Sequence, residues 1–296
     1  PFFWFLQHVM SCLEDKYVFI TGCDLGFGNL LARQLDLRGL KVLAACLTEQ
    51  GAQQLRKQTS DRLETVLLDV TKTESVVAAT QWEKEHVGDR GLWGLVNNAG
   101  ITLPAALNEW LTKDGFLKIL NVNLIGLIKV TLSFLPLIRK ARGRYLFGGG
   151  YSISNYGVEA FSDSLRRDLC AFGVHVALIE PGKFKTSIFP ENTQDILKGI
   201  WSQVSPEVKE SYGEQYFEDK RQKKKKKNNI WVNLNLSLIT NCMEHALIAV
   251  HPRTRYSAGW ESKFFTLTLS YLPTSVADFI LSPISNAVRP ADALQF

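Results

Sequence analysis

The stretch KYVFITGCDLGFG, residues 16–28, decides the fold. Its first seven residues read as a strand buried on both faces. Glycines follow at the spacing Gly-x-x-x-Gly-x-Gly, at Gly22, Gly26 and Gly28, and residues 27–39 then carry apolar side chains at helical spacing. A glycine-rich turn between a strand and a helix brings the backbone close to the positive helix end, which favours a phosphate. The stretch therefore predicts a dinucleotide site rather than a turn without a ligand.

Strand-like and helix-like patterns alternate along the first 182 residues. The expected strands are 16–22, 41–47, 63–70, 92–100 and 174–182. The expected helices are 27–39, a segment ending near residue 60, 71–88 with a capping box from Thr71 to Glu74, and 113–141. Continuous apolar strands separated by helices imply a parallel sheet covered on both faces. The fold class is therefore α/β, a doubly wound, Rossmann-like parallel sheet in a single domain with a carboxyl-terminal extension.

Composition narrows the class of protein. The 296 residues are 46% hydrophobic, enough for one large core, and the net charge is a mild +5. The basic run Arg221–Lys227 favours a solvated loop over contact with anionic lipid headgroups, and without interleaved aromatic residues it argues against nucleic acid. Cys46 and Cys170 lie in apolar patterns and are expected to be buried thiols in a reducing environment. We expect no metal site, since no histidine or cysteine spacing supports one.

The chain divides into three parts of one domain. Residues 1–15 are an apolar amino-terminal remnant whose segment PFFWFL is far shorter than the ~20 residues that span a bilayer; it is either a truncated membrane anchor or a short surface hydrophobe. Residues 16–186 form the dinucleotide-binding and catalytic core, and residues 187–296 the substrate lid and carboxyl-terminal extension. Within the extension, residues 263–281 are largely apolar, so they either bury against the domain or contact a membrane surface.

Several later motifs agree with the glycine spacing. They are LLDV at 67–70, NNAG at 97–100, NVNLIG at 121–126 and PGKFKT at 181–186. Together they resemble the short-chain dehydrogenase/reductase superfamily. The segments VLAACLTE, YGVEAFSDSLRRDL and HPRTRYSAGW look like its vertebrate microsomal branch of retinol dehydrogenases and 17-beta-hydroxysteroid dehydrogenases.

The resemblance implies an oxidoreductase that transfers hydride at the carbinol carbon of retinol or of 3-alpha- or 17-beta-hydroxysteroids. It further implies NAD as cofactor, with NADP not excluded, a location at the endoplasmic reticulum membrane, and no nucleic-acid partner; it leaves a homo-oligomer open. The cofactor-binding residues that it implies are Thr21, Gly22, Leu25, Gly26, Phe27, Gly28, Asp69, Val70, Asn97, Ala99, Gly100, Asn155, Pro181, Gly182 and Thr186.

Two positions near the glycine turn bear on the cofactor. An NAD enzyme commonly carries an acid after its second strand to bind the ribose hydroxyls. Here the corresponding residue is Cys46, with Glu49 nearby, and no arginine directly follows the strand to favour a 2′-phosphate. Leu25 departs from the small polar residue usual in the family, so binding should weaken without being lost.

The stretch YSISNYGVEAF, residues 151–161, carries the chemistry that the resemblance implies. Tyr151 takes the place of the acid/base and Asn123 that of the asparagine supporting its proton relay. The family's lysine, one helical turn after the tyrosine, is Asn155 here. Free tyrosine titrates near pH 10, and an amide cannot lower that pKa by charge. We expect a loss of ~10²–10⁴-fold in acid–base catalysis.

The family's catalytic serine is also missing. No serine occurs between Ser133 and Ser152, and Ser152 directly follows Tyr151, so it points elsewhere around the helix. Residues 144–150 reach at most about 23–25 Å. Either YLF in this segment forms a makeshift strand, or the sheet loses an interior strand. Lys183 is a candidate replacement cation near the nicotinamide, the alternative being an exposed loop lysine. The sequence thus allows an impaired oxidoreductase, a non-catalytic dinucleotide-binding pseudoenzyme, or a faulty gene product.

Overall fold

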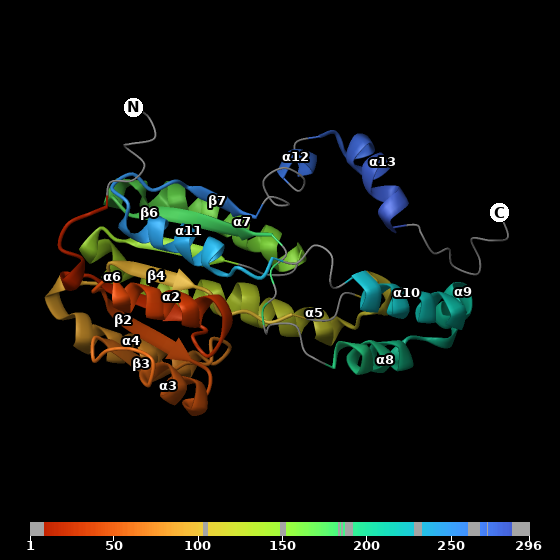
Figure 1. Cartoon of the computed structure of the whole chain (residues 1–296), viewed down its shortest axis with the longest axis horizontal. Coiled ribbons are helices and arrows are strands. Elements are labelled where there is room, and N and C mark those ends of the chain that lie inside the picture. Colours follow the sequence, from red (N-terminus) through yellow and green to blue (C-terminus); the bar gives the residue numbers. More distant parts are fainter. Residues whose placement is uncertain are drawn as a thin grey trace.

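A seven-stranded parallel sheet forms the centre of the molecule (Figure 1). The computed structural model describes residues 9–102, 106–148, 152–182, 184, 186, 192–227, 233–259, 267–270 and 272–285. The strand order is β3-β2-β1-β4-β5-β6-β7. The strands are β1 (Tyr17–Thr21), β2 (Lys41–Cys46), β3 (Leu63–Leu67), β4 (Gly94–Asn97), β5 (Arg144–Gly148), β6 (His175–Pro181) and β7 (Arg255–Ala258). The predicted doubly wound α/β fold is confirmed.

Helices cover both faces of the sheet. On one face lie α2 (Gly26–Leu37), α3 (Glu49–Arg56) and α11 (Ser237–Ile248), which share a core with Val18, Ile20 and Val96. On the other face lie α4 (Thr73–Val87), α6 (Leu127–Ala141) and α7 (Ser152–Leu169), which pack around Phe19 and Leu95. Alternate residues of each strand therefore enter different cores, as the continuous apolar runs predicted.

The long helix predicted at 113–141 is present but contains a change of pitch. It consists of α5 (Lys113–Leu120), a π-helical segment η4 (Asn121–Gly126) and α6. Among the described residues it is the one helix long and apolar enough to cross a membrane. Val130, Phe134 and Ile138 are nevertheless fully buried against the sheet, so the helix serves as a core helix here.

The makeshift strand expected from YLF is confirmed. β5 pairs in parallel with β4 from Gly94↔Arg144 to Asn97↔Phe147, and with β6 from Arg144↔His175 to Gly148↔Ile179. Tyr145 enters one core and Leu146 the other. The sheet therefore keeps its interior strand even though the connection to α7 is short.

Three local predictions are wrong. The first residue of the expected capping box, Thr71, instead hydrogen-bonds the Asp69 side chain, and α4 begins one residue later than that cap would require, without a side-chain cap. The basic run belongs to α10 (Glu214–Lys227) rather than to a loop. Cys170 is exposed, whereas Cys46 is buried as predicted.

A small helical subdomain projects from the carboxyl ends of the strands. It contains α8 (Thr193–Gln203), α9 (Pro206–Tyr212) and α10, and Figure 1 shows it beside α5, away from the sheet. We call its core the lid cluster. The lid cluster comprises Trp110, Leu197, Trp201, Val204, Tyr216 and Phe217. The rings of Trp201 and Phe217 stack at 4.8 Å, and Trp110 lies edge-on to Trp201 at the same distance.

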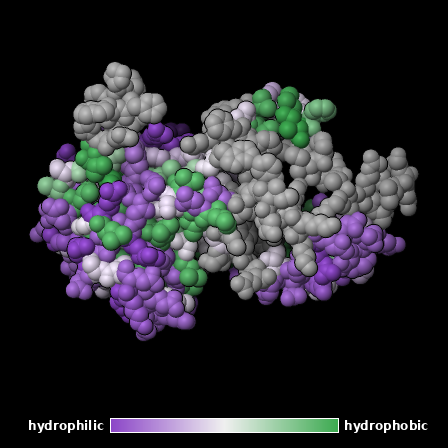
Figure 2. All heavy atoms as spheres, viewed as in Figure 1, coloured by the Kyte–Doolittle hydropathy of each residue, from purple (hydrophilic) through white to green (hydrophobic). Residues whose placement is uncertain are grey.

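The carboxyl-terminal extension forms α12 (Leu267–Ser270) and α13 (Thr274–Ser285), which stand off the body in Figure 1. Phe279 is 81% exposed, and Val276 and Ile280 are also exposed. Figure 2 shows this helix as an apolar surface patch. Burial of this part of residues 263–281 against the domain is therefore wrong for the residues that the structure describes.

Candidate functional site

The turn between β1 and α2 is held against the end of β4 by two side chains. Thr21 Oγ1 accepts hydrogen bonds from the backbone N–H groups of Asn98 and Ala99, both at 3.0 Å. Asn98 Nδ2 donates in return to the carbonyl oxygens of Thr21 and Gly22, both at 3.0 Å. Thr21 is buried. These bonds fix the backbone of the turn at the carboxyl ends of the strands, where open α/β sheets bind ligands.

The three glycines of the turn have different roles. Gly22 and Gly26 have φ values of 71° and 68°, which favour glycine. A Cβ on Gly28 would lie 2.4 Å from the Gly22 carbonyl oxygen. Gly28 therefore lets α2 pack closely on the turn, and its predicted part in cofactor binding stays a prediction.

The amino end of α2 has no capping side chain. Leu25 occupies the N-cap position in an extended conformation and is 61% exposed. The first N–H groups of a helix lack partners within it, so an uncapped end offers donors and positive partial charge. Phe27, in the first turn, meets Phe184 edge-on at 5.8 Å. This contact joins the glycine turn to the segment that follows β6.

Asp24, in the turn between β1 and α2, places its carboxylate at the end of β2, a contact that the sequence did not predict. Asp24 Oδ2 accepts from the Leu47 N–H at 2.7 Å, and its Oδ1 accepts from the N–H and hydroxyl of Thr48 at 2.9 and 2.7 Å. Cys46 is buried, and burial raises the pKa of its thiol to about 12. Glu49 pairs with Arg56 at 2.8 Å. Asp24 therefore places a carboxylate beside the residues that directly follow β2.

The segment after β3 is ordered around Asp69. Its carboxylate accepts from the N–H and hydroxyl of Thr71 at 3.0 and 2.6 Å, and Lys72 lies 3.6 Å away. The Thr71 hydrogen bond lowers the pKa of Asp69. Val70 is buried, and a Cβ on Gly126 would lie 2.8 Å from its Cγ2. Asp69 is partly exposed, whereas Val70 packs inward.

Asn97 points away from the glycine turn. It is buried, and its Nδ2 donates to the hydroxyl groups of Thr131 and Tyr145 beneath the sheet. Only its main chain can face a ligand. Tyr145 is fully buried, and burial raises its pKa well above the ordinary range, which excludes this phenol as an exposed acid/base.

Asn123 lies in the π-helical segment and is buried under the loop that follows β4. Its Oδ1 accepts from the Ile101 N–H at 2.9 Å, and its Nδ2 donates to the Ile101 carbonyl at 3.0 Å and to Ser154 Oγ at 3.4 Å. Gly100 lies directly above, since a Cβ there would be 3.5 Å from Asn123 Oδ1. Asn123 thus joins the β4 loop to the first turn of α7.

The helix α7 begins at Ser152, four residues after β5 ends at Gly148. Asn155 lies in its first turn and is half-buried. Tyr151 lies outside the described residues, so its predicted role remains a prediction. Within 134–151 the sequence supplies no serine, and the strand that does form ends too close to α7 for an additional loop.

The end of β6 brings a third segment to the same edge of the sheet. Pro181 is the last residue of the strand, and the Gly182 N–H donates to the Ala258 carbonyl of β7 at 3.0 Å. Thr186 is half-buried. Lys183 lies outside the described residues, and its replacement role stays a hypothesis. No cluster of metal-ligating side chains occurs among the residues that the structure describes.

Sequence reasoning missed three site residues. They are Asp24, Asn98 and Phe184, and each acts through a partner distant in the chain. Asn98 lies inside the quoted NNAG motif, so that motif was the available signal. Neither Asp24 nor Phe184 carries such a signal, because their roles depend on which strands become neighbours.

Comparison with known proteins gives consistent matches. The family model for short chain dehydrogenases matches residues 16–197. Rat retinol dehydrogenase 7 is 62% identical, over 97% of this chain and 94% of its own length. Human retinol dehydrogenase 16 and human 17-beta-hydroxysteroid dehydrogenase type 6 are 61% and 60% identical, each over 98% of this chain and 95% of its own length.

Solved structures match the fold. A short-chain dehydrogenase from Streptomyces avermitilis superposes with a TM-score of 0.65 at 21% identity, covering 92% of this chain and 98% of its own. An actinorhodin polyketide ketoreductase solved with NADPH has the same TM-score and identity, covering 86% of this chain and all of its own. The likeness at this identity extends to the arrangement of the sheet and its helices.

Proposed function

This chain belongs to the short-chain dehydrogenase family, and we propose that it binds NAD and is built for hydride transfer at the carbinol carbon of retinol or of a 3-alpha- or 17-beta-hydroxysteroid, with impaired turnover. The observation that carries the proposal is the glycine turn clamped by Asn98 beside the uncapped amino end of α2. The similarity to retinol dehydrogenases and a 17-beta-hydroxysteroid dehydrogenase supports the substrate class.

The described residues fit a dinucleotide. The pyrophosphate would lie at the amino end of α2, where N–H groups lack a capping side chain and the glycine turn leaves no Cβ in the way. Asp69 would meet the adenine, while Gly100, Pro181, Gly182 and Thr186 would surround the nicotinamide end. A bound nicotinamide supplies the hydride acceptor or donor.

We favour NAD over NADP because of Asp24. Its carboxylate is held at the end of β2 by three hydrogen bonds from Leu47 and Thr48. An acid in this region accepts from ribose hydroxyls and repels a 2′-phosphate. No arginine directly follows β2 to offset that repulsion.

Tyr151 would exchange the proton of the substrate oxygen, but its phenol lacks support. Asn155 lies at the family's lysine position and cannot lower the phenol pKa by charge. The missing serine removes a hydrogen-bond donor, which typically costs ~10²–10³-fold. Asn123 retains its place, joining the β4 loop to Ser154. The chain would therefore hold the reactants and transfer the proton slowly.

The substrate side would be the lid formed by α8, α9 and α10. The lid cluster buries Trp110 and Trp201 next to the loop that follows β4. Tyr212 donates to Glu109 Oε2 at 2.7 Å, and this hydrogen bond raises the tyrosine pKa to about 12. A lid with an aromatic core suits an apolar, lipid-like alcohol.

A membrane surface is the partner that we propose for α13. This helix carries Val276, Phe279 and Ile280 on its exposed surface, and Leu272 just before it is also exposed. Such a helix can lie in the interface of a bilayer, which would deliver a lipid-like substrate. Together with the family resemblance, this supports a location at the endoplasmic reticulum membrane.

A homo-oligomer would use a different face. Leu117, Ile125 and Leu132 are exposed at intervals of seven and eight along the helix from 113 to 141, and Ile153 and Tyr156 are exposed on the neighbouring α7. Apolar side chains in such a stripe favour pairing with a second copy. A monomer mass in sedimentation at micromolar concentration would contradict this part of the proposal.

Two measurements test the function. A calorimetric titration with NADH reports binding, and a retinol turnover assay with NAD reports chemistry. We expect binding with slow turnover. Binding with no turnover at all would instead favour the pseudoenzyme, which the missing serine also supports. Neither binding nor turnover from a folded chain would refute the dinucleotide site.

A further inference from the structure

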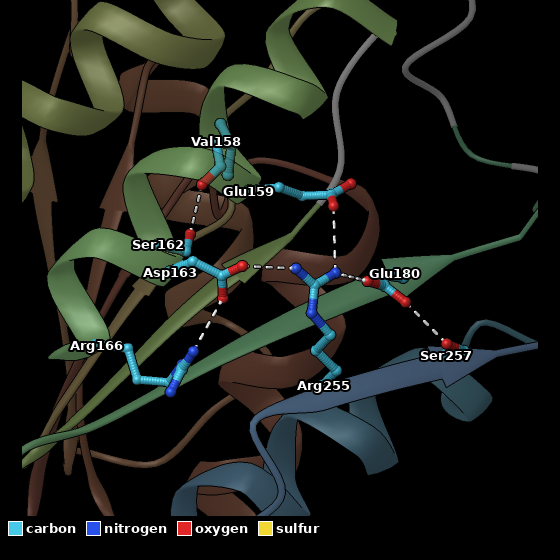
Figure 3. A network of polar contacts seen from close by, with 8 residues as sticks. All are labelled: Val158, Glu159, Ser162, Asp163, Arg166, Glu180, Arg255 and Ser257. Carbon is cyan, nitrogen blue, oxygen red and sulfur yellow. Dashed lines mark hydrogen bonds and ion pairs between the residues drawn. The ribbon is translucent and has the colours of Figure 1, made fainter. Parts of the chain in front are cut away.

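One guanidinium joins three elements at the edge of the sheet. Arg255, the first residue of β7, lies 2.6 Å from Glu180 Oε1 and 3.2 Å from Glu159 Oε2 through its Nη1. Its Nη2 lies 3.1 Å from Asp163 Oδ2. Glu180 belongs to β6, and the other two carboxylates belong to α7. Figure 3 shows the three carboxylates converging on Arg255 from these elements.

Further contacts fix two of the carboxylates. Ser257 Oγ, two residues along β7, donates to Glu180 Oε2 at 2.8 Å, and Arg166 lies 3.5 Å from Asp163 Oδ1 (Figure 3). Partial burial opposes the charge of Arg255, but its hydrogen bonds to the carboxylates outweigh this and raise its pKa further. The guanidinium is therefore a permanent cation, and its planar fork can serve several acceptors at once.

The members of the network keep contact with solvent, and we expect the domain to fold without them. The Arg255 side chain is 41% exposed and its carboxylate partners are 22–38% exposed. Ion pairs with this much solvent contact contribute little to global stability. The sheet ladder from Leu178↔Arg255 to Pro181↔Ala258 already holds β7 in place. The ion pairs from Arg255 to α7 therefore fix the position of α7 relative to β6 and β7 without adding buried apolar packing.

The carboxylates that Arg255 joins lie close in sequence to residues of the proposed nicotinamide position. Glu180 lies in β6 and directly precedes Pro181, the last residue of that strand, and Gly182. Glu159 and Asp163 follow Asn155 by one and two helical turns, so the three side chains share one side of α7. The guanidinium thus sets the distance between the end of β6 and the first turns of α7.

We propose that Arg255 is a positioning residue for the nicotinamide half of the cofactor site. It acts by tying the Pro181–Gly182 segment to the helix that carries Asn155. This inference rests on the proposed function, because it assumes that a dinucleotide binds at this edge of the sheet. The adenosine half is held by separate residues around the β1–α2 turn, so it should not depend on Arg255.

The test compares NADH with ADP-ribose, which lacks only the nicotinamide ring. NADH and ADP-ribose are each titrated calorimetrically into the wild type and Arg255→Met. We expect the variant to bind NADH ~10-fold more weakly, because a small misplacement of one binding segment weakens the contacts it makes. ADP-ribose should bind within about twofold of the wild type, and Arg255→Lys should recover only part of the NADH affinity, because an ammonium lacks the guanidinium fork.

Arg166→Met is the matched control. Arg166 pairs with Asp163 as well, but both residues lie on α7, so its loss breaks an ion pair without disconnecting elements. We expect unchanged affinity for both ligands. Circular dichroism and thermal unfolding check that each variant folds. If Arg255→Met does not fold, Glu180→Gln carries the test, with the same selective loss of NADH affinity expected.

The possible results separate the two proposals. Unchanged NADH affinity in Arg255→Met, or an equal loss for both ligands, would overturn the positioning role. A wild type that binds ADP-ribose but gains nothing from the nicotinamide would also overturn it while leaving the adenosine half intact. A folded wild type that binds neither ligand would refute the proposed function itself, and the positioning role with it.

Discussion

Replacing Glu83 by glutamine should make the protein less sensitive to alkaline pH. Glu83 lies on α4 between Ala79 and Val87, on the face that packs into the core with Phe134. Its side chain is completely buried, and neither carboxylate oxygen has a hydrogen-bond partner among the described residues. Burial raises the pKa of Glu83 to about 8, while Lys84 acts weakly in the opposite direction.

The sign of the effect follows from the protonation states. The folded protein holds the carboxyl protonated up to about pH 8, whereas in the unfolded chain it ionises near its ordinary pKa of 4.5. The contribution of Glu83 to stability is therefore highest below pH 4.5 and falls as the pH rises towards 8. At 1.36 kcal/mol per pH unit, the full loss is on the order of 5 kcal/mol, of which about 3 kcal/mol falls between pH 6 and pH 9.

Urea unfolding of the wild type and Glu83→Gln at pH 6 and pH 9 measures this loss. The free energy of unfolding of the variant, relative to the wild type, should rise by about 3 kcal/mol between the two pH values, because glutamine does not titrate. Glu85→Gln is the control, since Glu85 is exposed on the same helix; its difference from the wild type should not vary with pH. A flat difference for Glu83→Gln would refute the assignment of a neutral buried carboxyl.

Three other substitutions test the site. Leu25→Ser should tighten NADH binding about fivefold, which corresponds to one added hydrogen bond. Leu37→Ser, at the exposed far end of the same helix, should leave the affinity unchanged. Equal affinities of the two variants in calorimetry would contradict a role of the uncapped helix end in binding. Asn155→Lys alone should raise retinol turnover less than ~10-fold because the serine is still absent, and a gain of several hundredfold would show that the serine is dispensable. Phe279→Ser should weaken binding to phosphatidylcholine–phosphatidylserine vesicles, measured by co-sedimentation, at least threefold. The control is Phe172→Ser, because Phe172 is an exposed phenylalanine on the body of the protein. Equal vesicle binding by the two variants would show that α13 is not the membrane contact.

The strands were predictable because burial on both faces leaves a continuous apolar run. The expected segments 16–22 and 41–47 match β1 and β2 to within a residue or so at each end. The prediction 63–70 ran too far, because Asp69 leaves the ladder to accept hydrogen bonds from Thr71. The same bonds explain the missing helix cap, since the Thr71 hydroxyl already has a partner.

The site was only partly predictable, for a related reason. Glycine spacing depends on local backbone geometry, so Gly22 and Gly26 could be read from the sequence. The Asp24 contacts to the end of β2 and the Phe27–Phe184 contact join segments far apart in the chain. The basic run was taken for a loop because charge alone was weighed, whereas α10 begins earlier and its first turn buries Tyr216 and Phe217 in the lid cluster.

The short connection before Tyr151 separates the requirements of the fold from those of the chemistry. An interior strand needs backbone partners on both sides and a side chain for each core, and Arg144–Gly148 meets both needs through its ladders and through Tyr145 and Leu146. The family resemblance implies a catalytic hydroxyl beside the substrate oxygen, and no serine lies within residues 134–151 to provide it. The strand that keeps this edge of the sheet intact thus supplies no serine, which is why we expect this chain to retain dinucleotide binding better than turnover.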